Sequence, residues 1–187
     1  EIASCLVGSE MCIRDSPEIT RKAAMLRNQG MEKRYANEYV GLNNRMTDIH
    51  ASIGRVQLTK LAGWTKTRQE NAAFLSSNIT EAITPAVPEG YVHVYHQYTI
   101  RLEGATGEER DRFVTALKEE HQVGSGVYYP IPNHRLPSLA PYAPGLELPN
   151  TEKVAAECVS LPVHPSLSQA DRERIVAAVN TCAKAGA

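Results

Sequence analysis

The 187-residue sequence is poor in several features that define whole classes of protein. It has one Trp and two Phe, and it holds no run of the roughly 20 apolar residues that a membrane-spanning helix needs. Neither sign of charge dominates, since 20 Lys and Arg face 21 Asp and Glu, for a formal net charge of −1. Nucleic-acid arms and membrane-surface patches need clustered basic residues, so we expect neither a nucleic acid nor a membrane as partner.

Cysteine is also scarce, with four residues scattered at Cys5, Cys12, Cys158 and Cys182. They form no C-x-x-C pair and no Cys/His cluster, so we expect reduced thiols and no metal site. The sequence contains no P-loop, no G-x-G-x-x-G after a strand and no H-E-x-x-H motif. It opens without a basic-then-apolar leader, and we therefore expect a cytoplasmic protein.

The first 16 residues lack the periodicity of the rest of the chain. The stretch from Cys5 to Ser16 resembles the translation of a sequencing or library adapter. We interpret residues 1–16 as a non-native segment and exclude them from fold reasoning. A genuine irregular N-terminal loop is the alternative.

Residues 17–83 show helical patterns. Ser16 can cap a helix over about residues 17–29 that has Pro17 at its first position and Gly30 as its stop. A second, long helical pattern runs from Thr47 to about residue 83, and Gly63 is the expected break because Gly costs about 1 kcal/mol relative to Ala in a helix.

One face of the long pattern carries an apolar stripe. Its members recur at helical spacing, and they are Met46, Ile49, Ile53, Val56, Leu61 and Trp64. A helix of this length needs a partner surface to bury its stripe, and the sequence supplies little upstream. We therefore expect residues 17–83 to be the tail of a larger domain with connecting helices, and the stripe to be partly exposed in this chain.

Residues 84–187 predict a small C-terminal domain of α/β (α+β) class. The order is β-α-β-α-β-α, which indicates a small sheet with packed helices. Thr106 opens a capping box, and Thr151 and Ser168 are the expected caps of two later helices. Side chains alternate between two faces over residues 91–102 with the period of two that is typical of a strand. The predicted strand places His96 on its apolar face as a core histidine. Further strands are expected at 124–129 and 158–161.

Four segments, taken in order, resemble the DegT/StrS-type sugar aminotransferases, a branch of the fold type I enzymes that use pyridoxal 5′-phosphate (PLP). Each segment alone is a weak signal, but the order and approximate spacing match from about residue 17 to 180. The segments are LRNQG (26–30), GLNNRM (41–46) running into DIHASIG (48–54) and QL (57–58), VYYPIPNH (127–134) and SLPVHP (160–165).

The resemblance implies a homodimer that moves an amino group from glutamate or glutamine to a keto group on a nucleotide-linked sugar. In the family a lysine holds PLP as a Schiff base, shortly before the helix that begins here at Pro17. Residues 1–16 contain no lysine. We therefore expect this chain to be the C-terminal half of a fold type I PLP-dependent enzyme, without the catalytic lysine and inactive alone.

The resemblance also implies site residues. Asn43 matches the asparagine that bonds the PLP phosphate across the dimer, and Arg45 lies beside it, near phosphate and substrate. His134 matches the family's histidine at the mouth of the substrate site, and Tyr129 lies nearby in the same segment, so both are expected to bind substrate. On the residues alone, Asn43 could instead close a turn while Arg45 pairs with Asp48.

Two other functions stay open at the level of sequence. One is a PLP-dependent sugar dehydratase of the same family, in which a histidine replaces the lysine. The other is a non-catalytic α/β module that dimerises through its long helix.

Overall fold

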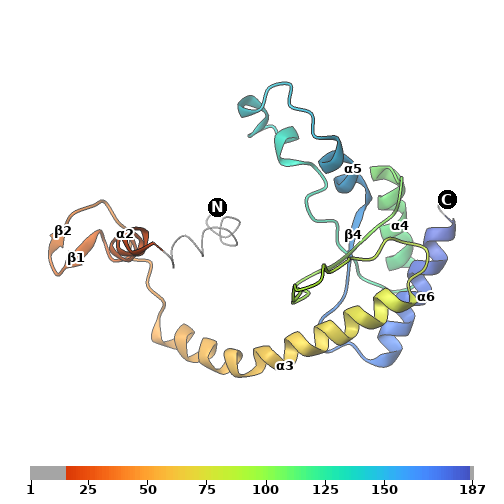
Figure 1. Ribbon diagram of the computed structural model, residues 1–187, viewed down its shortest axis with the longest axis horizontal. Helices are drawn as coiled ribbons and strands as arrows, with labels where there is room; N and C mark the ends of the chain where they lie inside the picture. The colour runs from red at the N-terminus through yellow and green to blue at the C-terminus, as the bar shows by residue number, and fades with distance from the viewer. Residues whose placement is uncertain (1–15, 186–187) are drawn as a thin grey trace. The chain divides into compact units, whose positions relative to one another are not determined.

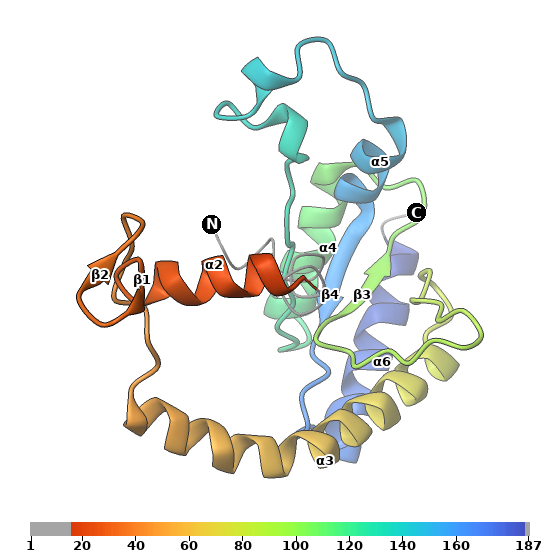
Figure 2. The ribbon, with the colours of Figure 1, turned by 60° about the vertical axis from the view of Figure 1, so that its left-hand side comes forward.

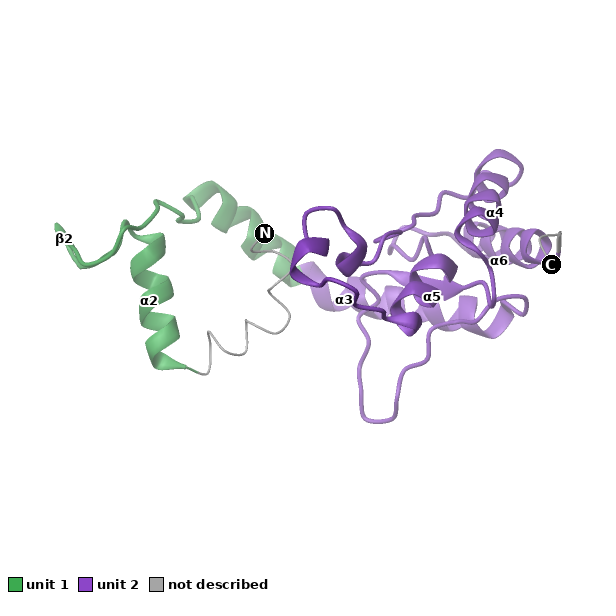
Figure 3. Ribbon diagram, turned by 90° about the horizontal axis from the view of Figure 1, so that it is seen from above, with its two compact units in different colours: residues 1–59 green, residues 60–187 purple. Residues whose placement is uncertain are grey.

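The computed structural model describes residues 16–185, so the interpretation of residues 1–16 as foreign lies outside the described residues apart from Ser16. The chain divides into two compact units, Glu1–Thr59 and Lys60–Ala187, with the boundary inside one long helix (Figure 3). Figure 1 labels most of the elements, which in chain order are α2 (Pro17–Arg27), β1 (Met31–Lys33), β2 (Ala36–Asn37), α3 (Asp48–Asn78), β3 (Tyr98–Arg101), α4 (Gly107–Glu119), 3-10 turns at Asn133–Arg135 and Ala140–Tyr142, α5 (Pro149–Glu157), β4 (Cys158–Leu161) and α6 (Gln169–Ala185).

The first helix, α2, begins where the sequence predicts. The Ser16 hydroxyl accepts a hydrogen bond from the backbone N–H of Ile19 at 3.4 Å, and Pro17 occupies the first turn. The helix ends at Arg27, two residues before the predicted end. Gly30 then adopts φ +76°, a conformation that glycine tolerates without strain, and the short antiparallel pair β1–β2 follows.

The long helix α3 is continuous over 31 residues, so the predicted break at Gly63 is wrong. A single glycine costs only about 1 kcal/mol, which the neighbouring turns of helix tolerate. The helix ends at Asn78, earlier than predicted. Its apolar stripe is exposed as expected, with Met46, Ile49, Ile53 and Val56 at 73, 74, 54 and 55% exposure.

The C-terminal unit is built on the antiparallel pair β3–β4, with Tyr98 opposite Leu161 and Arg101 opposite Cys158. Residues 91–97 form no strand, which corrects the predicted strand over 91–102, and His96 is exposed rather than in the core. The reason is the partner: β4 has four residues, so only four residues of the alternating segment find a ladder to join.

Of the remaining predictions for this unit, two are confirmed and two are wrong. The capping box at Thr106 and the cap at Ser168 are confirmed. The predicted strand over 124–129 is reduced to a single bridge from Gly126 to Ser160. Thr151 does not cap α5, because that helix begins two residues earlier at Pro149.

The core of the C-terminal unit lies between β3–β4, α4, α6 and the last turns of α3, and Figure 2 shows α4 and α6 beside the strand pair. Its buried apolar residues are Ala72, Leu75, Ile79, Tyr98, Ile100, Leu102, Phe113, Leu117, Val123, Val159, Leu161, Val163, Ile175, Ala178, Val179 and Cys182. Among the helices of residues 16–185, none combines the length and the apolar character needed to cross a bilayer.

Candidate functional site

The first group of candidate residues lies on the loop that follows the β1–β2 pair, and the end of α2 holds this loop in place. The backbone N–H of Leu42 donates to the carbonyl of Leu26 at 2.7 Å, and that of Asn44 donates to the carbonyl of Arg27 at 2.9 Å. Both carbonyls lie in the last turn of α2, where the helix itself provides no N–H donors for them. The loop therefore serves as the cap of α2, and the helix end fixes its position.

Gly41 lets the loop approach this closely. A Cβ placed on Gly41 would lie 2.2 Å from the backbone nitrogen of Gly30 and 2.7 Å from the carbonyl oxygen of Leu26. No real side chain tolerates such contacts with backbone atoms. The first glycine of the GLNNRM segment is thus required for packing of backbone against backbone.

Asn43 and Arg45 lie together on this loop. The Oδ1 atom of Asn43 accepts a hydrogen bond from Nε of Arg45 at 2.9 Å, and both residues are exposed. Between residues 16 and 185 the structure has no ion pair from Arg45 to Asp48, so the predicted alternative pairing is wrong. The Asn43–Arg45 contact itself leaves the Asn43 amide N–H groups and the end of the guanidinium able to donate elsewhere.

This donor set fits a phosphate. A carboxamide N–H and a guanidinium are the donors that proteins use for phosphate dianions, and the guanidinium presents a fixed fork of N–H groups. The contact from Arg45 to Oδ1 also turns the amide nitrogen of Asn43 away from Arg45. Both residues thus keep donor groups free on the same exposed loop.

The second group lies in the C-terminal unit, around a hollow of about 830 Å³ between α5 and the loop over residues 127–136. Tyr129 and His134 both line it, so the structure brings these two predicted residues together. The other lining residues are Tyr128, Pro132, Asn133, Leu148, Asn150, Thr151, Val154, Ala155 and Cys158. Most of the wall is apolar, with few polar groups, which is the usual make-up of a small-molecule site.

His134 is held firmly in this wall. Its side chain is 5% exposed, and its Nε2 lies 2.9 Å from Oε1 of Glu152. The same carboxylate oxygen accepts a hydrogen bond from the guanidinium of Arg135 at 2.8 Å. The hydrogen bonds from His134 and from Arg135 lower the pKa of Glu152 to about 2, so the carboxylate is charged at neutral pH. Glu152 does not line the hollow but contacts a residue that does, and the sequence did not reveal it.

Tyr129 is exposed at the rim of the same hollow and has an unusual backbone. Its φ is +58°, in the left-handed region that few residues other than glycine enter. Strained backbone of this kind persists where the surrounding structure enforces it, and it gathers at binding sites. Tyr129 and His134 thus lie in the C-terminal compact unit, whereas the first group of candidate residues, Asn43 and Arg45, lies in the N-terminal one.

The segments that carry these residues are also those that match known proteins. A model of the DegT/DnrJ/EryC1/StrS aminotransferase family matches residues 8–180. The chain belongs to this family. The resemblance drawn from the four sequence segments is thereby confirmed.

Two of the curated relatives are named as transaminases of different nucleotide-linked sugars, and a third is named as a regulatory protein. The chain is 31% identical, over 87% of its length, to the dTDP-3-amino-3,6-dideoxy-α-D-galactopyranose transaminase of Aneurinibacillus thermoaerophilus. It is 32% identical, over 90% of its length, to the UDP-N-acetyl-3-dehydro-α-D-glucosamine 3-aminotransferase of Acidithiobacillus ferrooxidans. A pleiotropic regulatory protein of Geobacillus stearothermophilus is 34% identical over 89% of the chain. The chain spans 44–45% of these three proteins, less than half of their length.

Solved structures of the family share the fold. S. venezuelae DesV, in complex with a ketimine intermediate, superposes on 90% of the chain and 45% of its own length, with a TM-score of 0.80 and 29% identity. Bacillus subtilis NtdA with bound cofactor PMP superposes on 91% of the chain and 40% of its own length, with a TM-score of 0.78 and 25% identity. These matches confirm the predicted fold class, the α/β part of a PLP-dependent aminotransferase.

Proposed function

We propose that this chain is part of a PLP-dependent aminotransferase that moves an amino group from glutamate or glutamine to a keto group on a nucleotide-linked sugar. One observation carries the proposal: in a chain that belongs to this family, the loop capping α2 holds exposed Asn43 and Arg45 in contact with each other, and both side chains have groups that can donate to a phosphate. The names of the relatives support the substrate class, since they include transaminases for dTDP-linked and UDP-linked sugars.

The cofactor of the complete enzyme is PLP, in agreement with the family and with the PMP found in NtdA. When bound, PLP supplies the electron sink for making and breaking the C–N bond. In this chain the Asn43 amide and the Arg45 guanidinium would hold its phosphate. Tyr129 and His134 would contact the sugar from the wall of the 830 Å³ hollow.

The assembly that we propose is a homodimer, in which Asn43 and Arg45 reach the cofactor of the partner subunit. The exposed apolar stripe on α3, which includes Ile49, Ile53 and Val56, supports a partner surface next to this loop. We further propose that the lysine that holds PLP lies outside this sequence, so that the chain alone is inactive, and that the complete enzyme is cytoplasmic.

The test is made in the complete enzyme, with this chain restored to its missing part. Asn43→Ala removes a hydrogen bond to a charged group, worth roughly 1.5–3 kcal/mol. The affinity for PLP should therefore fall by about 10- to 150-fold. Asn43→Asp should be worse, because it places a carboxylate beside the phosphate.

The matched control is Asn44→Ala, since Asn44 is the neighbouring residue of the same type and uses its backbone N–H in the loop. It should leave the PLP affinity unchanged. If Asn43 only shapes its turn, both Asn43 variants will lose thermal stability while their folded fraction binds PLP normally. Unchanged PLP affinity in Asn43→Asp would reject the cofactor role.

A further inference from the structure

One residue in the wall of the hollow in the C-terminal unit, His134, is hydrogen-bonded to a carboxylate that does not itself line the hollow. His134 is almost fully buried there, and a buried imidazole needs a hydrogen-bond partner for its N–H group. Oε1 of Glu152 supplies that partner at 2.9 Å from Nε2. Glu152 stands in the first turn of α5, 18 residues further along the chain.

The element that carries Glu152 is itself fixed. Pro149 starts α5 with a preset backbone angle, and the N–H of Glu152 donates to the carbonyl of Leu148 at 2.9 Å. At the other end of the helix, the buried guanidinium of Arg110 donates to the carbonyl of Ala155 at 2.6 Å, which ties α5 to α4. The carboxylate of Glu152 therefore projects from a rigid support.

The chemistry of the pair decides which ring nitrogen of His134 carries the proton. An ionised carboxylate can only accept, so Nε2 must be the donor to Glu152. Arg135 donates to the same oxygen, at 2.8 and 3.2 Å, and balances its charge, so the imidazole does not need to be protonated to keep its place. In the neutral ring Nδ1 then holds a lone pair. Between residues 16 and 185, no hydrogen bond to Nδ1 is present.

We propose that Glu152 is a positioning residue that fixes His134 in the wall of the hollow, with Nδ1 as the acceptor for a hydroxyl of the nucleotide-linked sugar. The inference rests on the proposed function for its substrate. It adds Glu152 to that function. Glu152 does not touch the sugar, but it sets the orientation and the tautomer of His134, which does.

The first experiment uses the 187-residue chain and needs no turnover. Nitrogen-15 NMR of the histidine rings at pH 8 should show a His134 ring with N–H at Nε2 and a lone pair at Nδ1, and slow exchange of the Nε2 proton with water. Glu152→Ala should abolish the slow exchange. Glu152→Gln should keep it, because the carboxamide oxygen also accepts.

The matched control is Glu147→Ala, which removes an exposed carboxylate two residues before α5 and should leave the His134 signals unchanged. The backbone amide spectrum of the core residues reports whether each variant is folded. A proton on Nδ1 in the unchanged chain, or a His134 signal unaffected by Glu152→Ala in a folded chain, would overturn the proposal.

The second experiment uses the complete enzyme, with dTDP-3-amino-3,6-dideoxy-α-D-galactopyranose and 2-oxoglutarate as probes of the reverse reaction. Loss of one neutral hydrogen bond to the sugar should raise its KM by roughly 3- to 10-fold in Glu152→Ala, with a smaller change in kcat. His134→Ala should have the same effect, and the double variant should be no worse. Additive effects would contradict action through His134.

The two experiments separate the two proposals. A complete enzyme that transfers no amino group would contradict the proposed function, whereas the ring spectrum decides the positioning by Glu152 without any turnover. Glu152→Gln should restore the KM to within about 2-fold of the unchanged enzyme. Failure of this rescue in an otherwise active enzyme would show that Glu152 does not act through its hydrogen bond to His134.

Discussion

The carboxylate of Glu157 is the most deeply buried charge on the described chain, at 1% exposure, and three hydrogen bonds make its burial possible. Arg101 donates twice to Oε2, and the backbone N–H of Gly104 donates to Oε1 at 2.9 Å. Burial alone would raise the pKa of Glu157, but the hydrogen bonds from Arg101 and Gly104 outweigh it and hold the pKa below its ordinary value. The residue therefore joins the end of α5 to the end of β3.

Replacing Glu157 by Gln should destabilise the chain by about 3 kcal/mol, because it leaves Arg101 without its charged partner beside the core. A group whose pKa is lowered on folding contributes stability above its unfolded pKa of about 4.3, and this contribution is lost as the pH falls through the folded pKa. The difference between the two chains should thus be full at pH 7 and shrink below about pH 4. Urea unfolding at several pH values measures it.

Glu89→Gln is the control for this comparison, since Glu89 is exposed in a turn. It should change the free energy of unfolding by less than about 0.5 kcal/mol. A difference between Glu157→Gln and the unchanged chain that stays constant from pH 7 to pH 3 would contradict the assignment to the carboxylate.

At the scale of the elements, helix starts with a capping motif were the easiest to predict. The Thr106 hydroxyl accepts from the N–H of Glu109 at 3.3 Å, and the Glu109 carboxylate accepts from the N–H of Thr106 at 2.7 Å. Both partners lie within four residues, so the motif can be read from the sequence alone. The same holds for Ser168 and Asp171 at the start of α6.

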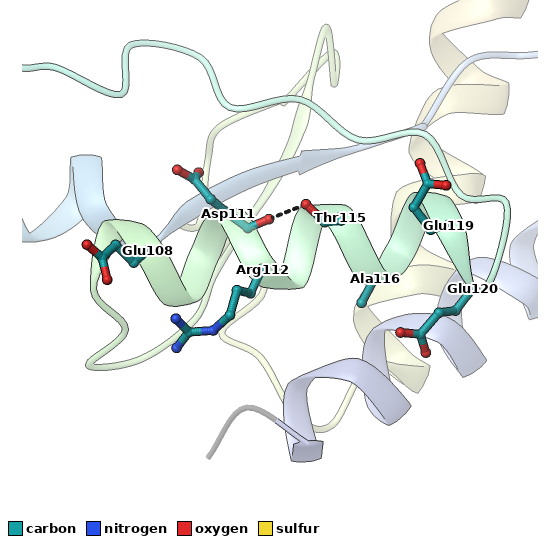
Figure 4. A pocket seen from close by; sticks show the side chains of 7 residues that line it. All are labelled: Glu108, Asp111, Arg112, Thr115, Ala116, Glu119 and Glu120. Atoms are coloured by element: carbon teal, nitrogen blue, oxygen red, sulfur yellow. Dashed lines mark hydrogen bonds between the residues drawn. The ribbon is translucent and has the colours of Figure 1, made fainter.

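Thr106→Ala should cost about 1 kcal/mol of unfolding free energy, because it leaves the first turn of α4 without its cap. Thr115→Ala is the matched control on the same helix. Its hydroxyl donates only to the carbonyl of Asp111, already inside the helix, on the exposed acidic face that Figure 4 shows. This variant should be neutral or slightly stabilising, since Ala has the higher helix propensity. Equal losses in urea unfolding would contradict the capping argument.

Elements that depend on distant partners could not be predicted to the residue. The alternation over 91–102 is real, but a strand exists only where another strand meets it, and β4 reaches no further than Tyr98. His96 therefore lies outside the sheet. The role of Glu152 could not be predicted for a similar reason, since its partner His134 is 18 residues away across a proline-rich loop. An acidic residue in the first turn of a helix was the only local signal, and it is also the ordinary preference of helix starts.

Taken as a whole, the chain carries the proposed phosphate donors and the proposed sugar-facing wall on two compact units, and it spans 44% of the length of the curated transaminase of Aneurinibacillus thermoaerophilus. We predict that the isolated chain forms no stoichiometric Schiff base with PLP at a single lysine. Borohydride reduction followed by peptide mass mapping checks this, with the complete enzyme as positive control. Trapping of PLP on one lysine of the isolated chain would contradict the proposal that the catalytic lysine lies outside it.

The exposed stripe on α3 has a consequence for how this helix opens. Ala72 and Leu75 lie in the core, whereas the half of the helix around Ile49 to Leu61 has little to pack against. Helices without tertiary packing are marginal in water, so in the isolated, monomeric chain the amide protons near Val56 should exchange with solvent at rates close to those of an unfolded peptide. Those near Leu75 should exchange only through global unfolding. One continuous helix would thus contain two regions of very different thermodynamic protection, and hydrogen–deuterium exchange along its length would find where one gives way to the other.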